Sequence, residues 1–157
     1  MTTTATRPRR ASIRDADLLN LTFPIAKRQP GEPPTPEDAS HVGLTRSLIR
    51  DRLNDCGLAS IVDEAMLVVS ELVTNAVLHS GAREITLTVN CLDGYLRIRV
   101  HDGVPGCRPT PQEPSSTEEN GRGLWLVEST ADSRGGSWGA SDDGATTWCN
   151  LALAVSQ

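Results

Sequence analysis

The sequence predicts an α+β fold, a two-layer sandwich whose mixed, mostly antiparallel sheet is covered on one face by three helices. Three observations predict it. Alternating segments joined by short turns indicate antiparallel hairpins, and apolar residues at helical spacing indicate helices between them. One of these helices is apolar around most of its circumference, which is typical of a helix buried on most sides. The expected order is strand, helix, helix, strand, strand, helix, strand, strand, and it lets every helix cover the same sheet face.

A proline-rich segment separates the first strand from the first helix. Leu18–Ile25 is predicted to be a strand, and Lys27–Glu37 contains four prolines and is predicted to be a loop. Apolar residues then recur at helical spacing over His41–Asp55, which predicts a helix with Asp38 or Ser40 as its N-cap.

The second helix, predicted over Ala59–Ser80, is the most informative element. It carries one narrow polar stripe at i, i+4 spacing, made of Ser70, Glu71, Thr74, Asn75 and His79. Burying an unpaired carboxylate costs several kcal/mol, so we expect the stripe to line a cavity that holds water, a metal or a ligand. Periodicity alone also allows the stripe to face solvent on a surface helix.

A hairpin follows the second helix. Glu84–Cys91 and Tyr95–His101 both alternate, and Asp93 and Gly94 between them are a strong turn signal. In the second of these strands the apolar residues share one face and the charged residues share the other, so we expect one covered and one wet sheet face.

The rest of the chain contains a long loop, a short helix and a closing hairpin. Asp102–Asn120 breaks the pattern with several prolines, and a loop of this length inside a domain is usually functional. Gly121–Ala131 is predicted to be a helix, and Ser137–Ala140 and Ala145–Val155 are predicted to be strands.

Length, charge and hydropathy exclude several classes of protein. A chain of 157 residues and 16.8 kDa suits one domain, expected over residues 18–157 after a disordered tail at residues 1–17. Its net charge of −5 argues against binding nucleic acid by phosphate neutralisation. The longest apolar runs have five residues, against roughly 20 for a membrane helix. No export signal is recognised, so we expect a cytoplasmic protein. The widely spaced cysteines predict neither a disulfide framework nor a zinc site.

Two further motifs can carry chemistry. Asp102 follows a strand directly, and a carboxylate there can accept hydrogen bonds from an exocyclic amine, although a plain Asp-Gly turn has the same pattern. The segment Gly121-Arg122-Gly123-Leu124 opens a helix, and free N–H groups at a helix N-terminus can bind phosphate. An ordinary flexible helix entry would look the same.

Taken together, four segments resemble the N, G1, G2 and G3 boxes of the Bergerat-fold ATPases. They are ELVTNAVLHSG (71–81), DGVPG (102–106), GRGLWLVE (121–128) and GATTW (144–148). The resemblance is closest to the small stand-alone anti-sigma-factor serine/threonine kinases. It implies the Bergerat ATP-binding fold, with ATP and Mg²⁺ as cofactors.

The resemblance also implies roles for residues of the N and G1 boxes. Glu71 would be the general base or would orient the attacking hydroxyl. Asn75 would coordinate the Mg²⁺ that bridges the ATP phosphates. Asp102 would accept the adenine amino group, with Gly106 beside the base.

In the second half of the chain, the resemblance makes residues 107–120 the ATP lid. The N–H groups around Gly121, Gly123 and Leu124 would hold the phosphates. Thr146, on a closing strand, would support the adenine pocket near Asp102.

Two positions depart from the pattern. Val104 stands where relatives usually have the middle glycine of the G1 box, and a β-branched residue does not comfortably adopt a positive φ. We therefore expect a reshaped pocket with lowered affinity. Ala145 stands where relatives often have lysine, and neither change removes Glu71, Asn75 or Asp102.

The function implied is an ATP-dependent protein kinase that phosphorylates a Ser or Thr of an anti-anti-sigma (STAS-type) partner and silences a sigma factor. The alternatives are a nucleotide-gated binding module without turnover, and a degenerate fold that serves only as an interaction surface. A homodimer formed through edge strands or the first helices is compatible with the resemblance. The Glu71→Gln variant discriminates kinase from binding module.

Overall fold

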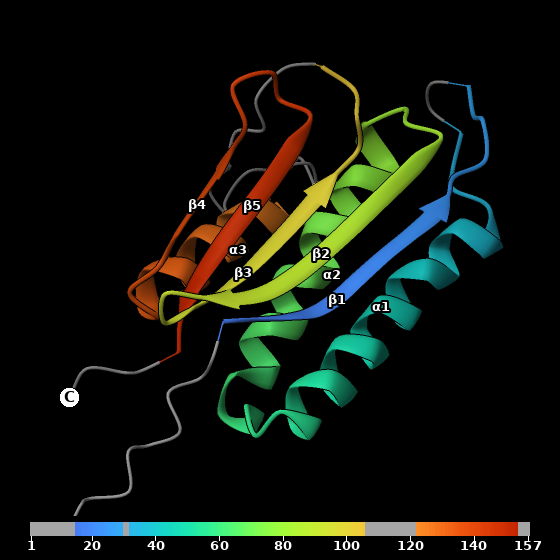
Figure 1. The fold of residues 1–157 in the computed structure, drawn as a ribbon. Helices are drawn as coiled ribbons and strands as arrows, with labels where there is room; N and C mark the ends of the chain where they lie inside the picture. Colours follow the sequence, from blue (N-terminus) through green and yellow to red (C-terminus); the bar gives the residue numbers. More distant parts are fainter. Residues whose placement is uncertain (1–14, 30–31, 106–121, 154–157) are drawn as a thin grey trace, which may run out of the picture.

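Five strands form one sheet in the computed structural model, which describes residues 15–29, 32–105 and 122–153. In chain order they are β1 (Ala16–Pro24), β2 (Glu84–Leu92), β3 (Tyr95–His101), β4 (Ser137–Ala140) and β5 (Thr146–Ala152). The strands lie in the order β1-β2-β3-β5-β4, and every pair of neighbours is antiparallel (Figure 1). The sheet in the described part of the chain is therefore wholly antiparallel rather than mixed.

Three helices cover one face of this sheet. They are α1 (Pro36–Asp55), α2 (Val62–His79) and α3 (Arg122–Ser133), and a short 3₁₀ helix at Ala59–Ile61 precedes α2. All three lie behind the sheet in Figure 1 and leave its other face open. The α+β two-layer sandwich is confirmed. No helix within the described ranges is long and apolar enough to cross a membrane.

The β2–β3 hairpin shows why the sequence folds into this sheet. Asp93 and Gly94 adopt positive φ angles of 53° and 81°, the conformation that a tight hairpin turn requires. In β3, Ile98 and Val100 are buried, whereas the intervening Arg99 is exposed. The apolar residues of the alternating pattern thus lie on the covered face of the sheet and the charged ones on the open face, as predicted.

Helix α1 begins five residues before its predicted start. Thr35 is the N-cap, because its hydroxyl accepts a hydrogen bond from the Asp38 N–H at 3.1 Å. Pro36 occupies the first helical position, where a missing N–H costs nothing. The predicted caps, Asp38 and Ser40, are wrong. The Asp38 carboxylate is buried instead and accepts a hydrogen bond from the Ala26 N–H at 3.1 Å.

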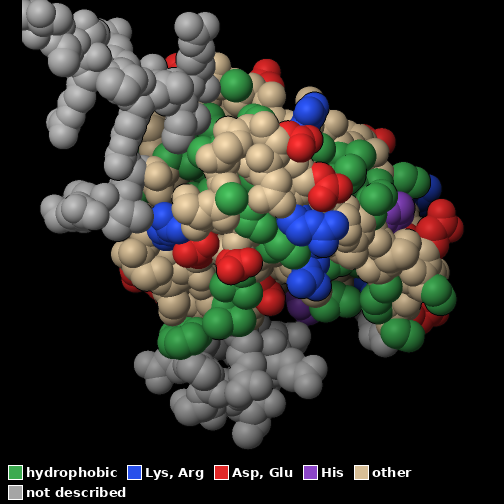
Figure 2. Space-filling model, turned by 90° about the horizontal axis from the view of Figure 1, so that it is seen from below, with side chains coloured by type: hydrophobic (Ala, Val, Ile, Leu, Met, Phe, Trp, Pro, Cys, Tyr) green, Lys and Arg blue, Asp and Glu red, His purple; other side chains and the backbone are tan. Residues whose placement is uncertain are grey.

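The surface shown in Figure 2 carries acidic and basic side chains interspersed among uncharged ones, with a small group of basic side chains near its centre. Of the cysteines, Cys56 is exposed, Cys91 and Cys149 are buried, and all three are free thiols. Cys107 lies outside the described residues.

Candidate functional site

Helix α2 positions Glu71 and Asn75 on its partly open side. The rest of the helix is apolar, and eight of its residues are buried: Val62, Ala65, Val68, Val69, Leu72, Val73, Ala76 and Val77. Glu71 and Asn75 lie one turn apart on the same face, and both are half-buried. Desolvation raises the pKa of the Glu71 carboxyl above its ordinary value. The polar stripe therefore does not face open solvent, at least at these two positions.

The Glu71 carboxylate lies against the backbone of Gly123, in the first turn of α3. A Cβ atom placed on Gly123 would lie 2.1 Å from Glu71 Oε2 and 3.1 Å from Glu71 Cδ. Only a residue without a side chain leaves this space for the carboxylate. The two motifs, 52 positions apart in the sequence, meet at this contact.

Asp102 lies directly after β3, where the chain leaves the sheet. Its N–H donates to the Ala145 carbonyl at 2.9 Å, and its Oδ1 accepts from the Val104 N–H at 2.8 Å. Desolvation raises the pKa of the Asp102 carboxyl, and the hydrogen bond from Val104 and the nearby His101 act in the opposite direction. The side chain is thus held in place at the end of the strand.

The backbone after Asp102 shows how the chain accommodates valine in the G1 box. Gly103 has a positive φ of 70°, whereas Val104 is not in the left-handed region. Among the non-glycine residues that the structure describes, Asp93 alone has a positive φ. The valine therefore causes no backbone strain of this kind, and it is 37% exposed.

Thr146 lies next to Asp102 through the sheet register. It pairs with His101 in the β3–β5 ladder, and its hydroxyl lies 2.8 Å from His101 Nδ1. The Thr146 side chain is thus hydrogen-bonded to His101, the residue directly before Asp102. His101 belongs to none of the motifs, although its place as the last residue of β3, directly before Asp102, was a usable signal.

The register brings the end of β3 and the end of α2 to the same end of the sheet. His101 pairs with Thr86 near the start of β2, and β2 begins five residues after α2 ends (Figure 1). Of the other predicted site residues, Leu124 is buried in the core, so only its backbone N–H could serve a ligand. Gly106, Gly121 and the expected lid at residues 107–120 lie outside the described residues.

The pKa shift at Glu71 predicts how stability depends on pH. Because the folded-state pKa lies above its ordinary value near 4.5, the folded chain binds this proton more tightly than the unfolded chain does. The stability that the group contributes is thus present below the unfolded pKa and is lost as pH rises through the folded pKa. We expect Glu71→Gln, measured without nucleotide, to raise the free energy of unfolding at neutral pH and to lose this advantage near about pH 4. Urea unfolding at several pH values tests this.

The control for that measurement is Glu84→Gln, which removes an exposed carboxylate at the start of β2. A stability difference between Glu71→Gln and the parent chain that did not change with pH would contradict the prediction.

Comparison with known proteins identifies the family. Residues 35–149 match the histidine kinase-like ATPase domain, and the chain belongs to this family. The matched range contains all four described polar positions, Glu71, Asn75, Asp102 and Thr146. An ATPase domain implies ATP binding, and the site is compatible with this, because the Glu71 carboxylate lies against Gly123 at the start of α3. No curated protein gave a significant match.

Proposed function

We propose that this chain is an ATP-dependent serine/threonine protein kinase whose acceptor is a Ser or Thr of an anti-anti-sigma (STAS-type) protein, and that it also binds and silences a sigma factor. The observation that carries the proposal is the placement of Glu71. Its carboxylate is half-buried, lies against the backbone of Gly123 and precedes Asn75 by one helical turn. A carboxylate held in this way suits proton transfer beside a phosphate-binding helix start.

Different described residues would bind the adenine, the Mg²⁺ and the phosphates of ATP. Asp102 would accept a hydrogen bond from the adenine amino group, and its anchorage to Val104 and Ala145 keeps it in place for that contact. The amide oxygen of Asn75 is a hard ligand suited to Mg²⁺. When bound, Mg²⁺ would neutralise charge on the phosphates. The first N–H groups of α3 form the positive end of the helix dipole and would face the phosphates.

Glu71 would act on the acceptor hydroxyl. In the transfer a bond forms between the acceptor oxygen and the γ-phosphorus, the bond from that phosphorus to the β,γ-bridging oxygen breaks, and ADP leaves. The hydroxyl proton goes to the Glu71 carboxylate. Burial raises the pKa of this carboxyl, and a base with a pKa closer to the working pH accepts a proton more effectively.

The test compares the parent chain with Glu71→Gln. Each is incubated with ATP labelled on the γ-phosphate and a panel of purified STAS-type proteins, and ATP affinity is measured separately by calorimetry. We expect label on a Ser or Thr with the parent chain. Glu71→Gln should lower the rate by about 100-fold or more, the range of a positioned general base, with ATP affinity nearly unchanged.

Two results would contradict the kinase assignment. One is ATP binding by the parent chain without label on any acceptor, which favours a nucleotide-gated binding module. The other is equal labelling by Glu71→Gln, which removes Glu71 from the chemistry.

A further inference from the structure

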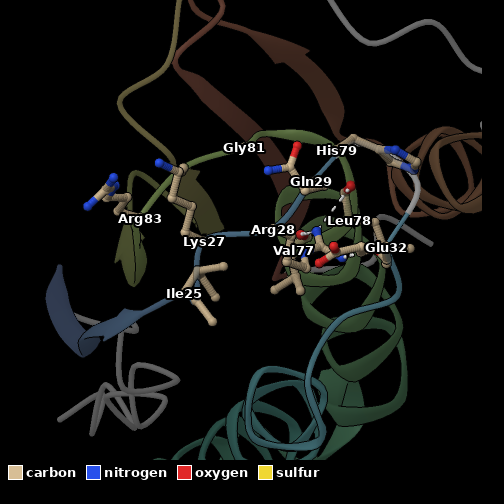
Figure 3. Close-up of a pocket in the computed structure, with 12 residues that line it drawn as sticks. Ile25, Lys27, Arg28, Gln29, Glu32, Val77, Leu78, His79, Gly81 and Arg83 are labelled. Atoms are coloured by element: carbon tan, nitrogen blue, oxygen red, sulfur yellow. Dashed lines mark hydrogen bonds between the residues drawn. The ribbon is translucent and has the colours of Figure 1, made fainter.

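A pocket of about 590 Å³ lies beside the last turn of α2, between that turn and the segment that follows β1 (Figure 3). Its walls are residues 25–29 with Glu32 on one side, and residues 77–79 and 81–83 on the other. Residues 77–79 and 81 belong to the N box segment, and the proposed function gives none of the lining residues a role.

Arg28 holds the two walls together. Its guanidinium donates hydrogen bonds to the carbonyl oxygens of Val77 and Leu78, the latter at 3.3 Å, and to the Glu32 carbonyl at 3.1 Å. Figure 3 shows this side chain reaching toward the end of α2. The last carbonyls of a helix lack intrahelical partners and form the negative end of its dipole, so a cation here both caps and stabilises the helix. The pocket is therefore built before any ligand binds.

The rim of the pocket is basic. Lys27 and Arg83 are exposed, and within the described ranges no hydrogen bond or ion pair engages either side chain. A backbone hydrogen bond of 2.8 Å from Ile25 N to the Arg83 carbonyl brings their segments side by side. Glu32 is the one acidic residue among the described lining residues. On a chain with net charge −5, this is a local reversal of sign.

The pocket also exposes an apolar side chain. Leu78 is 41% exposed, although it belongs to the most apolar of the three α-helices that the structure describes. Ile25, Val77 and Ala82 lie buried around it. The exposed leucine offers one apolar contact inside the basic rim.

The pocket lies close to the proposed phosphoryl-transfer site. Leu78 follows Asn75 by three residues on the same helix, which corresponds to about 5 Å along the helix axis. A partner segment bound here would therefore need only a few residues to reach the transfer site.

We propose that this pocket docks an acidic segment of a protein partner, with one apolar side chain on Leu78 and its carboxylates at Lys27 and Arg83. That the partner is the phosphoryl acceptor rests on the function proposed above. The docking itself does not, because the rim and the exposed leucine exist without nucleotide.

The first test is NMR titration of the full nitrogen-labelled chain with a synthetic heptapeptide of Asp and Glu around one central Leu. We expect saturable shifts confined to the amides of residues 25–29 and 77–83. Lys27→Glu combined with Arg83→Glu should weaken binding by about tenfold or more, as loss of complementary charges does. The control combines Arg97→Glu with Arg99→Glu, an equal change of charge on the open sheet face, and should leave binding nearly unchanged.

Several outcomes would overturn the docking proposal. One is that both double variants weaken peptide binding equally, and another is that inorganic phosphate alone causes the same shifts. The others are that a peptide with Asn and Gln in place of the acids, or one with Ser in place of Leu, binds as tightly as the original peptide. The spectra of each variant also report whether it is folded.

The second test separates docking from the kinase proposal. With a labelled STAS-type acceptor, Lys27→Glu combined with Arg83→Glu should raise KM for the acceptor severalfold and leave kcat and ATP affinity nearly unchanged. If peptide binds but the parent chain labels no acceptor, the kinase proposal fails and the docking proposal stands. If the parent chain labels an acceptor with the same KM as the double variant, the pocket is not where that acceptor docks.

Discussion

Replacing Asp102 with Asn is expected to weaken ATP binding by about 10- to 100-fold, the range for losing a hydrogen bond to a charged group. The carboxylate only accepts hydrogen bonds, whereas the amide directs an N–H₂ group or a weaker acceptor toward the adenine amine. The fold should be preserved, because the amide oxygen can still accept from the Val104 N–H and the backbone bond to Ala145 is unchanged. Calorimetric titration with ATP and Mg²⁺ measures the effect.

The matched control for Asp102→Asn is Asp55→Asn, which removes a carboxylate at the exposed end of α1. It should bind ATP like the parent chain. Undiminished binding by Asp102→Asn would mean that adenine is recognised elsewhere, and absence of ATP binding by the parent chain would remove the nucleotide site altogether.

The second large effect is expected from Gly123→Ala. The new methyl group would lie 2.1 Å from Glu71 Oε2, closer than non-bonded atoms approach, so the carboxylate must move or the start of α3 must shift. Because the oxygen is the far end of a flexible side chain, we expect a small change in stability. Phosphoryl transfer should fall by about 100-fold, the cost of displacing a reacting group by roughly 1 Å. Thermal unfolding and the transfer assay together test this.

Gly43→Ala is the control with the same chemical change. Gly43 lies within α1, and a Cβ atom there would meet nothing within 4 Å. Alanine should raise the free energy of unfolding by about 0.5–1 kcal/mol through helix propensity, without affecting transfer. If Gly123→Ala retained full phosphoryl transfer, the contact between Glu71 and Gly123 would not be needed for the reaction.

Local patterns predicted the elements of the fold well. Alternation over Tyr95–His101, the Asp93-Gly94 turn and the nearly continuous apolar surface of α2 each depend on residues close in sequence, and each was confirmed. The start of α1 was predicted wrongly, because a cluster of prolines was taken to exclude a helix. Pro36 is in fact the first residue of α1, and Thr35 supplies the cap. A proline breaks the interior of a helix but not its first turn.

The candidate site was predicted in part. The sequence placed Glu71 and Asn75 on one face of a helix and Asp102 at a strand end, and the structure describes all three there. It did not predict which residue at the strand end is the hydrogen-bond partner of Thr146, and in the structure that partner is His101. That choice depends on which face of the antiparallel ladder each side chain occupies, and the register between β3 and β5 decides it.

The sequence by itself determined the class of fold, the family resemblance and the polar positions, since periodicity and motif spacing are properties of neighbouring residues. Only the tertiary structure decided that the Glu71 carboxylate lies on Gly123 and that Arg28 caps the end of α2. Both contacts join segments about 50 residues apart. Their geometry results from how the helices pack on the sheet, because one apolar face can meet its neighbours at many relative positions and only complete packing selects one.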